Sequence, residues 1–297
     1  MRAAIDIGSN SVLLLVMDGA RVAHDEARVV GLGRGLGEKG VFRPDRMDAT
    51  LDALRSFAGT AAAMGVAPEC VRALATSAAR RALNAATFFA LVRKTTGLRV
   101  DIISGEEEAR LTYLGGIDGL ELPQAPVMLC DAGGGSTEII VGEGPHIRSR
   151  ISLEIGTVRL TEKHIGVGAV DPAAFARLRA DVDAAVSSVH LDTPPRAVVA
   201  VAGTATTLAA AELGLETYDS ARVHGARLSA GALRNWIDRL LASTPEERRR
   251  LVAASPERAD TVLAGAVILL RVLELGRRQT WRISDRGLRY GALTSAS

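Results

Sequence analysis

Two short stretches of this chain combine acidic side chains with glycines, whose backbone is not covered by a side chain. The first is DIGSNS at residues 6–11, and the second is DAGGGSTE at residues 131–138. Glycine in a strand costs roughly 0.5–1 kcal/mol relative to alanine, so glycines beside strand-like apolar runs indicate a tight turn or a close approach of the main chain to a ligand. Successive N–H groups at such a bend can form an anion-binding nest. The two stretches therefore indicate phosphate binding.

The two stretches also repeat one another. Three residues recur at the same offsets, first as Asp6, Gly8 and Ser11 and then as Asp131, Gly133 and Ser136. A single glycine hairpin is usually only a turn, but the repetition, with an acid at the same place each time, favours a ligand. A polyanion with repeating phosphates suits a pair of opposed amide nests, because each N–H donated to a charged oxygen contributes about 1.5–3 kcal/mol.

Two better-known phosphate loops can be set aside. The chain has no G-x-x-x-x-G-K-[ST] motif, which excludes a P-loop. GLGEKG at residues 35–40 fits G-x-G-x-x-G, but VFRP follows, and Pro44 delays any helix that a dinucleotide site would need. We interpret this motif as a chance match or as a mobile loop at the edge of a cleft.

Carboxylates on the glycine stretches are candidates for metal binding. Phosphoryl transfer to water needs a metal to neutralise charge and a group to orient the nucleophile. Asp6, Asp131 and Glu138 lie where they could hold Mg²⁺, or another divalent cation such as Mn²⁺, directly or through its waters. The alternative for each aspartate is a turn residue that bonds its own backbone.

A third acidic stretch, SGEEEARL, begins at Ser104. We expect a capping box in which Ser104 caps a helix and Glu107 reaches back to the serine N–H. Glu106 and Glu108 then point about 160–200° apart around the helix, so only one of them can face a cleft. Crowded acids in a first turn either favour the helix dipole or raise a carboxylate pKa toward the range of a general base.

The elements around these motifs predict an α/β fold that is duplicated. Apolar periodicity gives the order βββαβαβα in the first half, and the same order begins again near Pro126. The predicted strands lie in 3–30 (three runs), 71–76, 99–103, 127–130, 137–142, 146–155, 196–203 and 280–284. The main predicted helices lie in 44–65, 77–97, 104–116, 173–190 and 204–213. We expect two domains, 1–120 and 121–297, flanking a cleft, with the last helical turn packing back on the first domain.

Composition places few further limits on function. With 297 residues, 47% hydrophobic and 24% charged, the chain resembles an ordinary globular protein long enough for two domains. Only three of its 36 basic residues are lysines, and the arginines are scattered, which favours a coding bias over a nucleic-acid patch. Cys70 and Cys130 have neither metal nor disulfide spacing. No export signal is visible, and we expect a cytoplasmic protein.

The most apolar segment is too short to cross a membrane. The run VLAGAVILL at residues 262–270 has nine residues, whereas a bilayer needs about 20. The surrounding stretch, 261–275, is either a core helix, which is the commoner case, or the face of a homodimer.

Six ordered motifs together resemble the exopolyphosphatase and guanosine pentaphosphate phosphohydrolase family (Ppx/GppA). They are DIGSNS, ATSAARRALN, SGEEEARLTYLG, DAGGGSTE, GTATTLAA and SDRGLRYGAL, and they run from one end of the chain to the other. The resemblance implies two actin-like, sugar-kinase-like domains. It also implies metal-dependent hydrolysis of terminal phosphoanhydrides in polyphosphate or pppGpp.

The resemblance also assigns roles to residues. It implies that Glu108 is the catalytic glutamate, that Asp131 and Glu138 serve the metal and the attacking water, and that Arg80 binds substrate. The implied phosphate-binding amides are those of Gly8, Ser9, Asn10, Ser11, Gly133, Gly134, Gly135, Ser136 and Thr137. Gly203 and Thr204 are expected to complete the substrate site.

The chain departs from the family pattern in three places. Ala132 replaces the usual isoleucine, Tyr290 stands where an acid often follows GLR, and longer members continue into a helical C-terminal region. We therefore expect short polyphosphates to be handled at least as well as long chains. Three alternatives stay open: a pppGpp phosphohydrolase, a non-catalytic sensor of (p)ppGpp, and a small-molecule kinase with part of its adenosine pocket in GTATTLAA.

Overall fold

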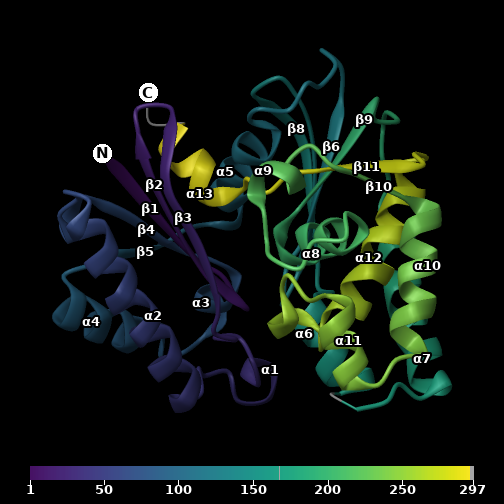
Figure 1. Ribbon diagram of the computed structural model, residues 1–297, viewed down its shortest axis with the longest axis horizontal. Helices are drawn as coiled ribbons and strands as arrows, with labels where there is room; N and C mark the ends of the chain where they lie inside the picture. The colour runs from purple at the N-terminus through teal and green to yellow at the C-terminus, as the bar shows by residue number, and fades with distance from the viewer. Residues whose placement is uncertain (167, 295–297) are drawn as a thin grey trace. The chain divides into compact units, whose positions relative to one another are not determined.

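The computed structural model describes residues 1–166 and 168–294. The chain divides into two compact units, each with its own sheet and core (Figure 1). Unit 1 comprises Met1–Gly115 and the chain from Leu288 onward, and unit 2 comprises Gly116–Gly287.

Unit 1 is built on a five-stranded sheet in the order β3-β2-β1-β4-β5. Its strands are β1 (Arg2–Ile7), β2 (Ser11–Asp18), β3 (Arg21–Val29), β4 (Val71–Ala75) and β5 (Val100–Ile102). The first three are antiparallel neighbours, whereas β4 pairs parallel to both β1 and β5. The three predicted runs within 3–30 are therefore strands, as expected.

Helices cover both faces of this sheet because alternate residues of each strand point to opposite sides. Ile5 and Leu14 lie in one core with α2 (Pro44–Ala63) and α4 (Ala85–Thr96). Ala4 and Leu15 lie in a second core with α5 (Gly105–Ile117) and α13 (Leu288–Thr294). Figure 1 shows α2 and α4 on one side of the purple strands and the yellow α13 on the other.

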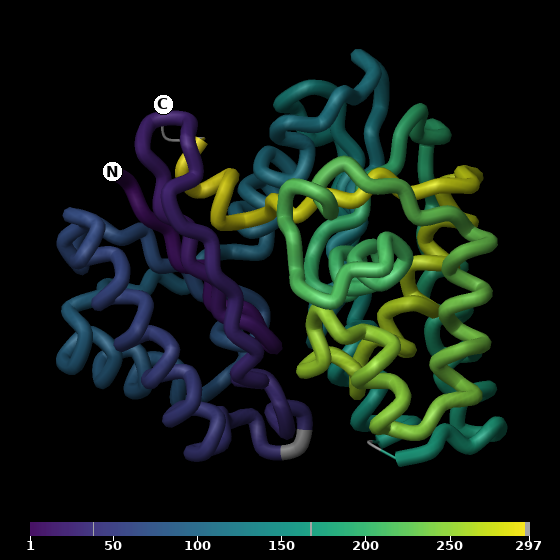
Figure 2. The backbone as a smooth tube through the Cα atoms, viewed as in Figure 1, coloured from purple at the N-terminus to yellow at the C-terminus, as the bar shows by residue number. Residues whose placement is uncertain are grey.

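The last helix, α13, is anchored on the first strands of unit 1. The Arg289 guanidinium donates two hydrogen bonds of 2.9 Å to the Asp25 carboxylate in β3, and the Tyr290 hydroxyl donates to the same carboxylate at 3.0 Å. Arg72 and Arg2 donate to carbonyls near the end of the helix. Figure 2 shows this yellow segment beside the purple strands of unit 1.

The single helix predicted over 77–97 is wrong, because the structure has two helices there. The first is α3 (Ser77–Arg81), and α4 begins at Ala85. Between them the Asn84 side chain accepts from the Phe42 N–H at 2.8 Å and donates to the Phe42 carbonyl at 3.1 Å. This long-range clamp holds the 82–84 segment out of a continuous helix, although the apolar periodicity runs through it.

Unit 2 repeats the arrangement with one strand added. Its sheet has the order β10-β11-β9-β6-β7-β8. The strands are β6 (Val127–Ala132), β7 (Thr137–Glu143), β8 (His146–Leu153), β9 (Ala197–Val201), β10 (Arg227–Ser229) and β11 (Thr280–Ile283). Read from β8 to β11, the order and the parallel or antiparallel sense of each pair match those of unit 1. The predicted duplication is confirmed, and β10 is an edge strand that the sequence did not predict.

The repeat extends to irregularities of the strands. A register shift occurs between Val16 and Met17 where β2 pairs with β3, and another occurs between Val141 and Gly142 where β7 pairs with β8. The two positions are 125 residues apart, the same offset that relates Asp6 to Asp131. A shared bulge is a specific feature of backbone geometry, so it supports a common origin for the two halves.

The helices of unit 2 enclose a large apolar core. They are α6 (Thr157–Leu160), α7 (Pro172–Ser187), α8 (Ala202–Glu212), α9 (Ser220–Val223), α10 (Ala230–Leu241), α11 (Pro245–Leu251) and α12 (Val262–Leu275). Most of α12 is fully buried in this core, so the apolar segment 261–275 is a core helix. Across the described ranges, every helix is too short or too polar to traverse a lipid bilayer.

Candidate active site

Loop 1, Gly8–Asn10, joins β1 to β2 in a tight hairpin. The Gly8 N–H donates to the Ser11 carbonyl at 2.9 Å, and a Cβ at Gly8 would lie only 3.2 Å from that oxygen. Asp6 is the next-to-last residue of β1, on the entry side of the loop, and lies opposite Leu13 of β2.

The carbonyl groups of loop 1 are used by the segment that follows β3. The Ser9 carbonyl accepts from the Gly33 N–H at 2.7 Å, and the Asn10 carbonyl accepts from the Val30 and Gly31 N–H groups at 3.0 and 2.9 Å. Among the described residues, the N–H groups of Ser9 and Asn10 have no acceptor. The loop therefore keeps its donors for a ligand, as an anion nest requires.

Loop 2, Gly133–Ser136, joins β6 to β7 and is held in the same way. The Gly133 carbonyl accepts from the Thr157 N–H at 2.9 Å, and the Gly134 carbonyl accepts from the Val158 N–H at 3.0 Å. A Cβ at Gly156 would lie 2.5 Å from the Gly134 carbonyl oxygen, so only glycine fits beside the loop. Within residues 1–166 and 168–294, no acceptor is found for the Gly134 and Gly135 N–H groups.

Two polar side chains at the loops are buried, and they differ in whether their oxygen atoms are hydrogen-bonded. The Thr137 hydroxyl is fully buried and donates to the Ile155 carbonyl at 2.7 Å, so it supports loop 2 from below. Asn10 is also buried, and its Oδ1 atom has no hydrogen-bond donor in the part of the chain that the structure describes. A buried acceptor without a donor is costly, which makes Asn10 a candidate for contact with a ligand or its water.

Glu108 is the inward-facing acid of α5. Its side chain is 14% exposed, and its Oε2 atom accepts from Arg80 Nη1 at 2.6 Å. Glu106, two residues before Glu108, is exposed. Glu107 receives the Arg110 guanidinium at 2.8 and 2.9 Å, and these hydrogen bonds hold the pKa of Glu107 below its usual value. The structure therefore singles out Glu108 among the three consecutive acids.

Asp6 shares an electrostatic environment with Glu108. Burial, and after it the charge of Glu108, raise the pKa of Asp6 to about 7 against the opposing charge of Arg289. A carboxylate that is buried beside another carboxylate is stabilised by a cation. Unit 1 thus brings together three of the predicted site residues, Asp6, Arg80 and Glu108.

The acids of unit 2 lie on adjacent strands. Asp131 of β6 and Glu138 of β7 are direct partners in the antiparallel register, which brings their side chains to neighbouring positions of one sheet face. Ser152 donates to Glu138 Oε1 at 3.0 Å. Burial and these two carboxylates raise the pKa of the Cys130 thiol well above its usual value. Cys130 is buried, Cys70 is exposed, and both are free thiols.

The two opposed carboxylates fit a divalent cation. Mg²⁺ is commonly held by one or two carboxylates together with substrate phosphates and water. In the part of the chain that the structure describes, no group of three or more His, Cys, Asp and Glu side chains gathers as a protein-only metal cage. Asp131 and Glu138 are the two neighbouring carboxylates of unit 2 that could hold such a cation.

Gly203 and Thr204 lie at the start of α8, at the same end of the sheet as Asp131. Val201 ends β9 as the parallel partner of Asp131, and Ala202 turns the chain with a φ of 69°. A Cβ at Gly203 would lie 1.9 Å from Arg258 Nη1, so the guanidinium packs directly on this glycine. Burial lowers the pKa of Arg258.

A comparison with protein families agrees with these features. The model of the Ppx/GppA phosphatase family matches residues 16–297. The chain belongs to this family. Exopolyphosphatase 2 of Mycobacterium tuberculosis is 36% identical over 284 residues, which cover 90% of this chain and 88% of that protein.

Solved structures of the family share the fold of this chain. The Aquifex aeolicus Ppx/GppA family member matches with a TM-score of 0.81 and 36% identity, over 99% of this chain and 96% of that one. An exopolyphosphatase from Cytophaga hutchinsonii matches with a TM-score of 0.89 and 26% identity, over 99% and 96%. The fold is α/β, with two units of duplicated topology.

Two buried arginines near the predicted site were missed by sequence reasoning. Arg258 covers Gly203, and its charge interacts with Glu257, Tyr218 and Asp285. Arg289 lies in unit 1, where its charge opposes the rise in the pKa of Asp6. Arg289 stands in the GLRYG stretch, where a basic residue in an apolar segment was an available signal. Arg258 in SPERAD carried no comparable signal.

Proposed function

We propose that this protein is an exopolyphosphatase, which hydrolyses the terminal phosphoanhydride bond of inorganic polyphosphate and releases orthophosphate. The observation that carries the proposal is the pair of equivalent glycine loops. In each loop the carbonyl groups are bonded by the segment after the third strand, while N–H groups such as those of Ser9 and Gly134 are left as donors. Each loop binds phosphate through these N–H groups.

The similarity to named exopolyphosphatases supports this substrate. Exopolyphosphatase 2 of Mycobacterium tuberculosis matches along most of its length. The family description also names GppA, so pppGpp is the second candidate substrate. A kinase reaction is less favoured, because the Arg258 guanidinium covers Gly203 where the adenosine pocket would begin.

Unit 1 supplies the group that activates water. Glu108 orients a water molecule and accepts its proton as the oxygen attacks the terminal phosphorus. The bond from that phosphorus to the bridging oxygen breaks, the shortened chain leaves with the bridging oxygen, and orthophosphate is released without a covalent intermediate. Arg80, which pairs with Glu108 at 2.6 Å, donates to phosphate oxygens when substrate is bound.

A divalent cation, Mg²⁺ or Mn²⁺, belongs to this proposal. Asp131 and Glu138 of unit 2 are one candidate pair of ligands for it, and Asp6 of unit 1 is a further candidate, directly or through water. When bound, the cation neutralises charge on the phosphate oxygens. The raised pKa of Asp6 is consistent with a carboxylate that is stabilised by such a cation.

Phosphate release from polyphosphate tests the proposal. Wild type is expected to release orthophosphate with Mg²⁺ and to lose activity in EDTA, and Glu108→Gln is expected to lower kcat by roughly 100- to 10,000-fold, as removal of a general base does. Glu106→Gln is the matched control, because Glu106 is an exposed glutamate two residues before Glu108 in the same helix.

Other substrates separate the remaining functions. Release from pppGpp but not from polyphosphate would favour the phosphohydrolase. Binding of pppGpp without release would favour the sensor, and release only with ATP and an acceptor would favour a kinase. A series from tripolyphosphate upward tests the preference for short chains, which a steep rise of rate with length would refute.

A further inference from the structure

The repeat that relates the two halves continues past the third strand of each unit. The Gly33 N–H donates to the Ser9 carbonyl at 2.7 Å, and the Val158 N–H donates to the Gly134 carbonyl at 3.0 Å. Donor and acceptor in the second bond both lie 125 residues after those in the first. The segments 30–36 and 155–161 are thus equivalent supports, one for each glycine loop.

The same offset pairs two arginines, Arg34 and Arg159. Each follows directly after the residue whose N–H bonds the loop, so each is attached to the loop by a neighbouring backbone hydrogen bond. Each also lies three residues after a buried or closely packed glycine, Gly31 or Gly156. Two copies of a cation at one position beside a phosphate loop point to a common use.

Among the side chains that the structure describes, Arg34 forms no ion pair. Its side chain folds back over Gly31, where Cδ and Nε would lie 2.8 and 2.9 Å from an added Cβ. Gly31 in turn donates to the Asn10 carbonyl of loop 1. The stem of Arg34 is therefore packed against the backbone that supports the loop.

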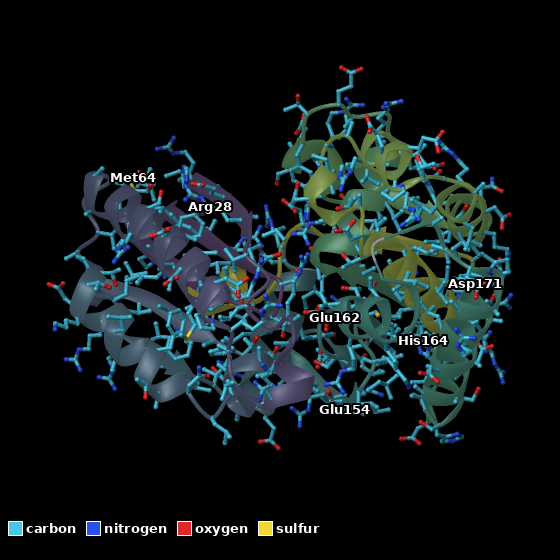
Figure 3. The ribbon with its side chains drawn as sticks, turned by 90° about the horizontal axis from the view of Figure 1, so that it is seen from below. Arg28, Met64, Glu154, Glu162, His164 and Asp171 are labelled. Carbon is cyan, nitrogen blue, oxygen red and sulfur yellow. The ribbon has the colours of Figure 1, made fainter. Side chains whose placement is uncertain are left out.

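Arg159 forms an ion pair with an exposed glutamate, Glu154, which a phosphate can replace. Its backbone N–H donates to the Gly134 carbonyl at 3.1 Å, and its guanidinium lies 2.8 Å from Glu154. The Glu154 side chain is 73% exposed at the surface of unit 2 (Figure 3). Ion pairs with such an exposed member contribute little, so a phosphate can replace the carboxylate.

The G-x-G-x-x-G segment, residues 35–40, contains a helical turn that the sequence did not predict. Gly35 has a φ of 72° and Leu36–Lys39 form one helical turn, so a helix does begin inside the motif. The segment just before this turn is hydrogen-bonded to loop 1 through Gly33. Arg34 therefore lies between the residue that bonds loop 1 and this helical turn.

We propose that Arg34 and Arg159 are substrate-binding residues, each of which binds the phosphate next to the one held by the amides of its own loop. This inference rests on the proposed function. Guanidinium groups bind phosphate in a bidentate manner, so each loop with its arginine would hold two consecutive phosphates of a chain. The pair then sets the affinity for polyphosphate and leaves the chemical step to other residues.

Steady-state kinetics with polyphosphate test the assignment. Arg34→Gln and Arg159→Gln are each expected to raise KM about tenfold and the double variant about 100-fold, with kcat within twofold of wild type. Arg34→Lys and Arg159→Lys should recover part of the lost affinity for polyphosphate, because lysine keeps the positive charge but cannot bind phosphate in a bidentate manner. Arg55→Gln and Arg250→Gln are the controls, since both are exposed arginines in helices away from the loops and carry the same charge change.

Values of KM within twofold of the controls would overturn the inference while leaving the proposed function intact. Melting temperatures show whether a variant is folded, and the lysine variants replace any glutamine variant that is not. If wild type releases no phosphate from polyphosphate, the proposed function fails, and calorimetric titration with tripolyphosphate decides the inference separately. Weaker binding by the arginine variants than by the controls would then support it, and equal binding would overturn it.

Discussion

Arg80 Nη1 lies 2.6 Å from Glu108 Oε2, so the two residues assigned to substrate binding and to water activation form an ion pair within unit 1. Arg80 comes from the short helix α3 and Glu108 from the first turn of α5. The same Arg80 nitrogen donates to the Ile103 carbonyl at 3.0 Å, which fixes the guanidinium just before α5 begins. The position of the glutamate thus depends on an arginine 28 residues earlier.

We expect Arg80→Gln to impair both substrate binding and turnover. Loss of the guanidinium removes a phosphate ligand, which should raise KM about tenfold, and it removes the partner that orients Glu108, which should lower kcat by a similar factor. Steady-state phosphate release measures both constants. Arg81→Gln is the neighbouring control on the exposed side of α3, and an equal loss in that variant would contradict the specific role of Arg80.

The raised pKa of Asp6 predicts a pH-dependent stability in the absence of metal. Because the folded-state pKa is about 7 and the ordinary value is 3.8, the stabilising contribution of protonated Asp6 is present below pH 4 and is lost as pH rises through 7. Asp6→Asn should therefore be more stable than wild type at pH 8, by up to about 4 kcal/mol since one pKa unit corresponds to about 1.4 kcal/mol. The two proteins should be equally stable at pH 4.

Denaturant unfolding in EDTA at the two pH values measures this difference. Added Mg²⁺ should reduce the difference in the free energy of unfolding between Asp6→Asn and wild type at pH 8, because it stabilises the wild-type carboxylate. A variant that is less stable than wild type at pH 8 in EDTA would show that Asp6 is not held in an unfavourable charged state.

Gly156→Ala should distort loop 2. A Cβ there would lie 2.5 Å from the Gly134 carbonyl oxygen and equally close to the Gly135 backbone, so the loop must shift. Overpacking of this kind costs about 1–3 kcal/mol and should lower both the melting temperature and the activity. Gly59→Ala is the control, because a Cβ at that position in α2 meets open space and alanine favours the helix. Unchanged activity in Gly156→Ala would show that loop 2 tolerates displacement.

The contacts of α13 with β3 should contribute strongly to the stability of unit 1. Arg289 and Asp25 are both largely buried, so Arg289→Met leaves an unpaired carboxylate and is expected to cost about 3–5 kcal/mol. Tyr290→Phe removes only the hydroxyl that donates to Asp25 and should cost about 1 kcal/mol. Equilibrium unfolding compares the two variants, and an Arg289→Met protein as stable as Tyr290→Phe would contradict the buried pair.

Several features of this protein were determined by the sequence alone. Strand and helix periodicity predicted the duplicated order, and the spacing of aspartate, glycine and serine located both glycine loops. Helix geometry indicated that only one of Glu106 and Glu108 can face a cleft, and the resemblance to the family pointed to Glu108. These signals are local, because each depends on residues within one element or one turn.

Other features were decided only by the tertiary structure. The break at Ala82–Asn84 depends on a clamp to Phe42, and the anchoring of Arg289 depends on Asp25, which lies 264 residues away. The loop carbonyls are bonded by segments that no local pattern connects to them, such as Gly33 and Val158. Long-range partners of this kind are chosen by packing and by the need to pair buried polar groups, so one stretch of sequence cannot specify them.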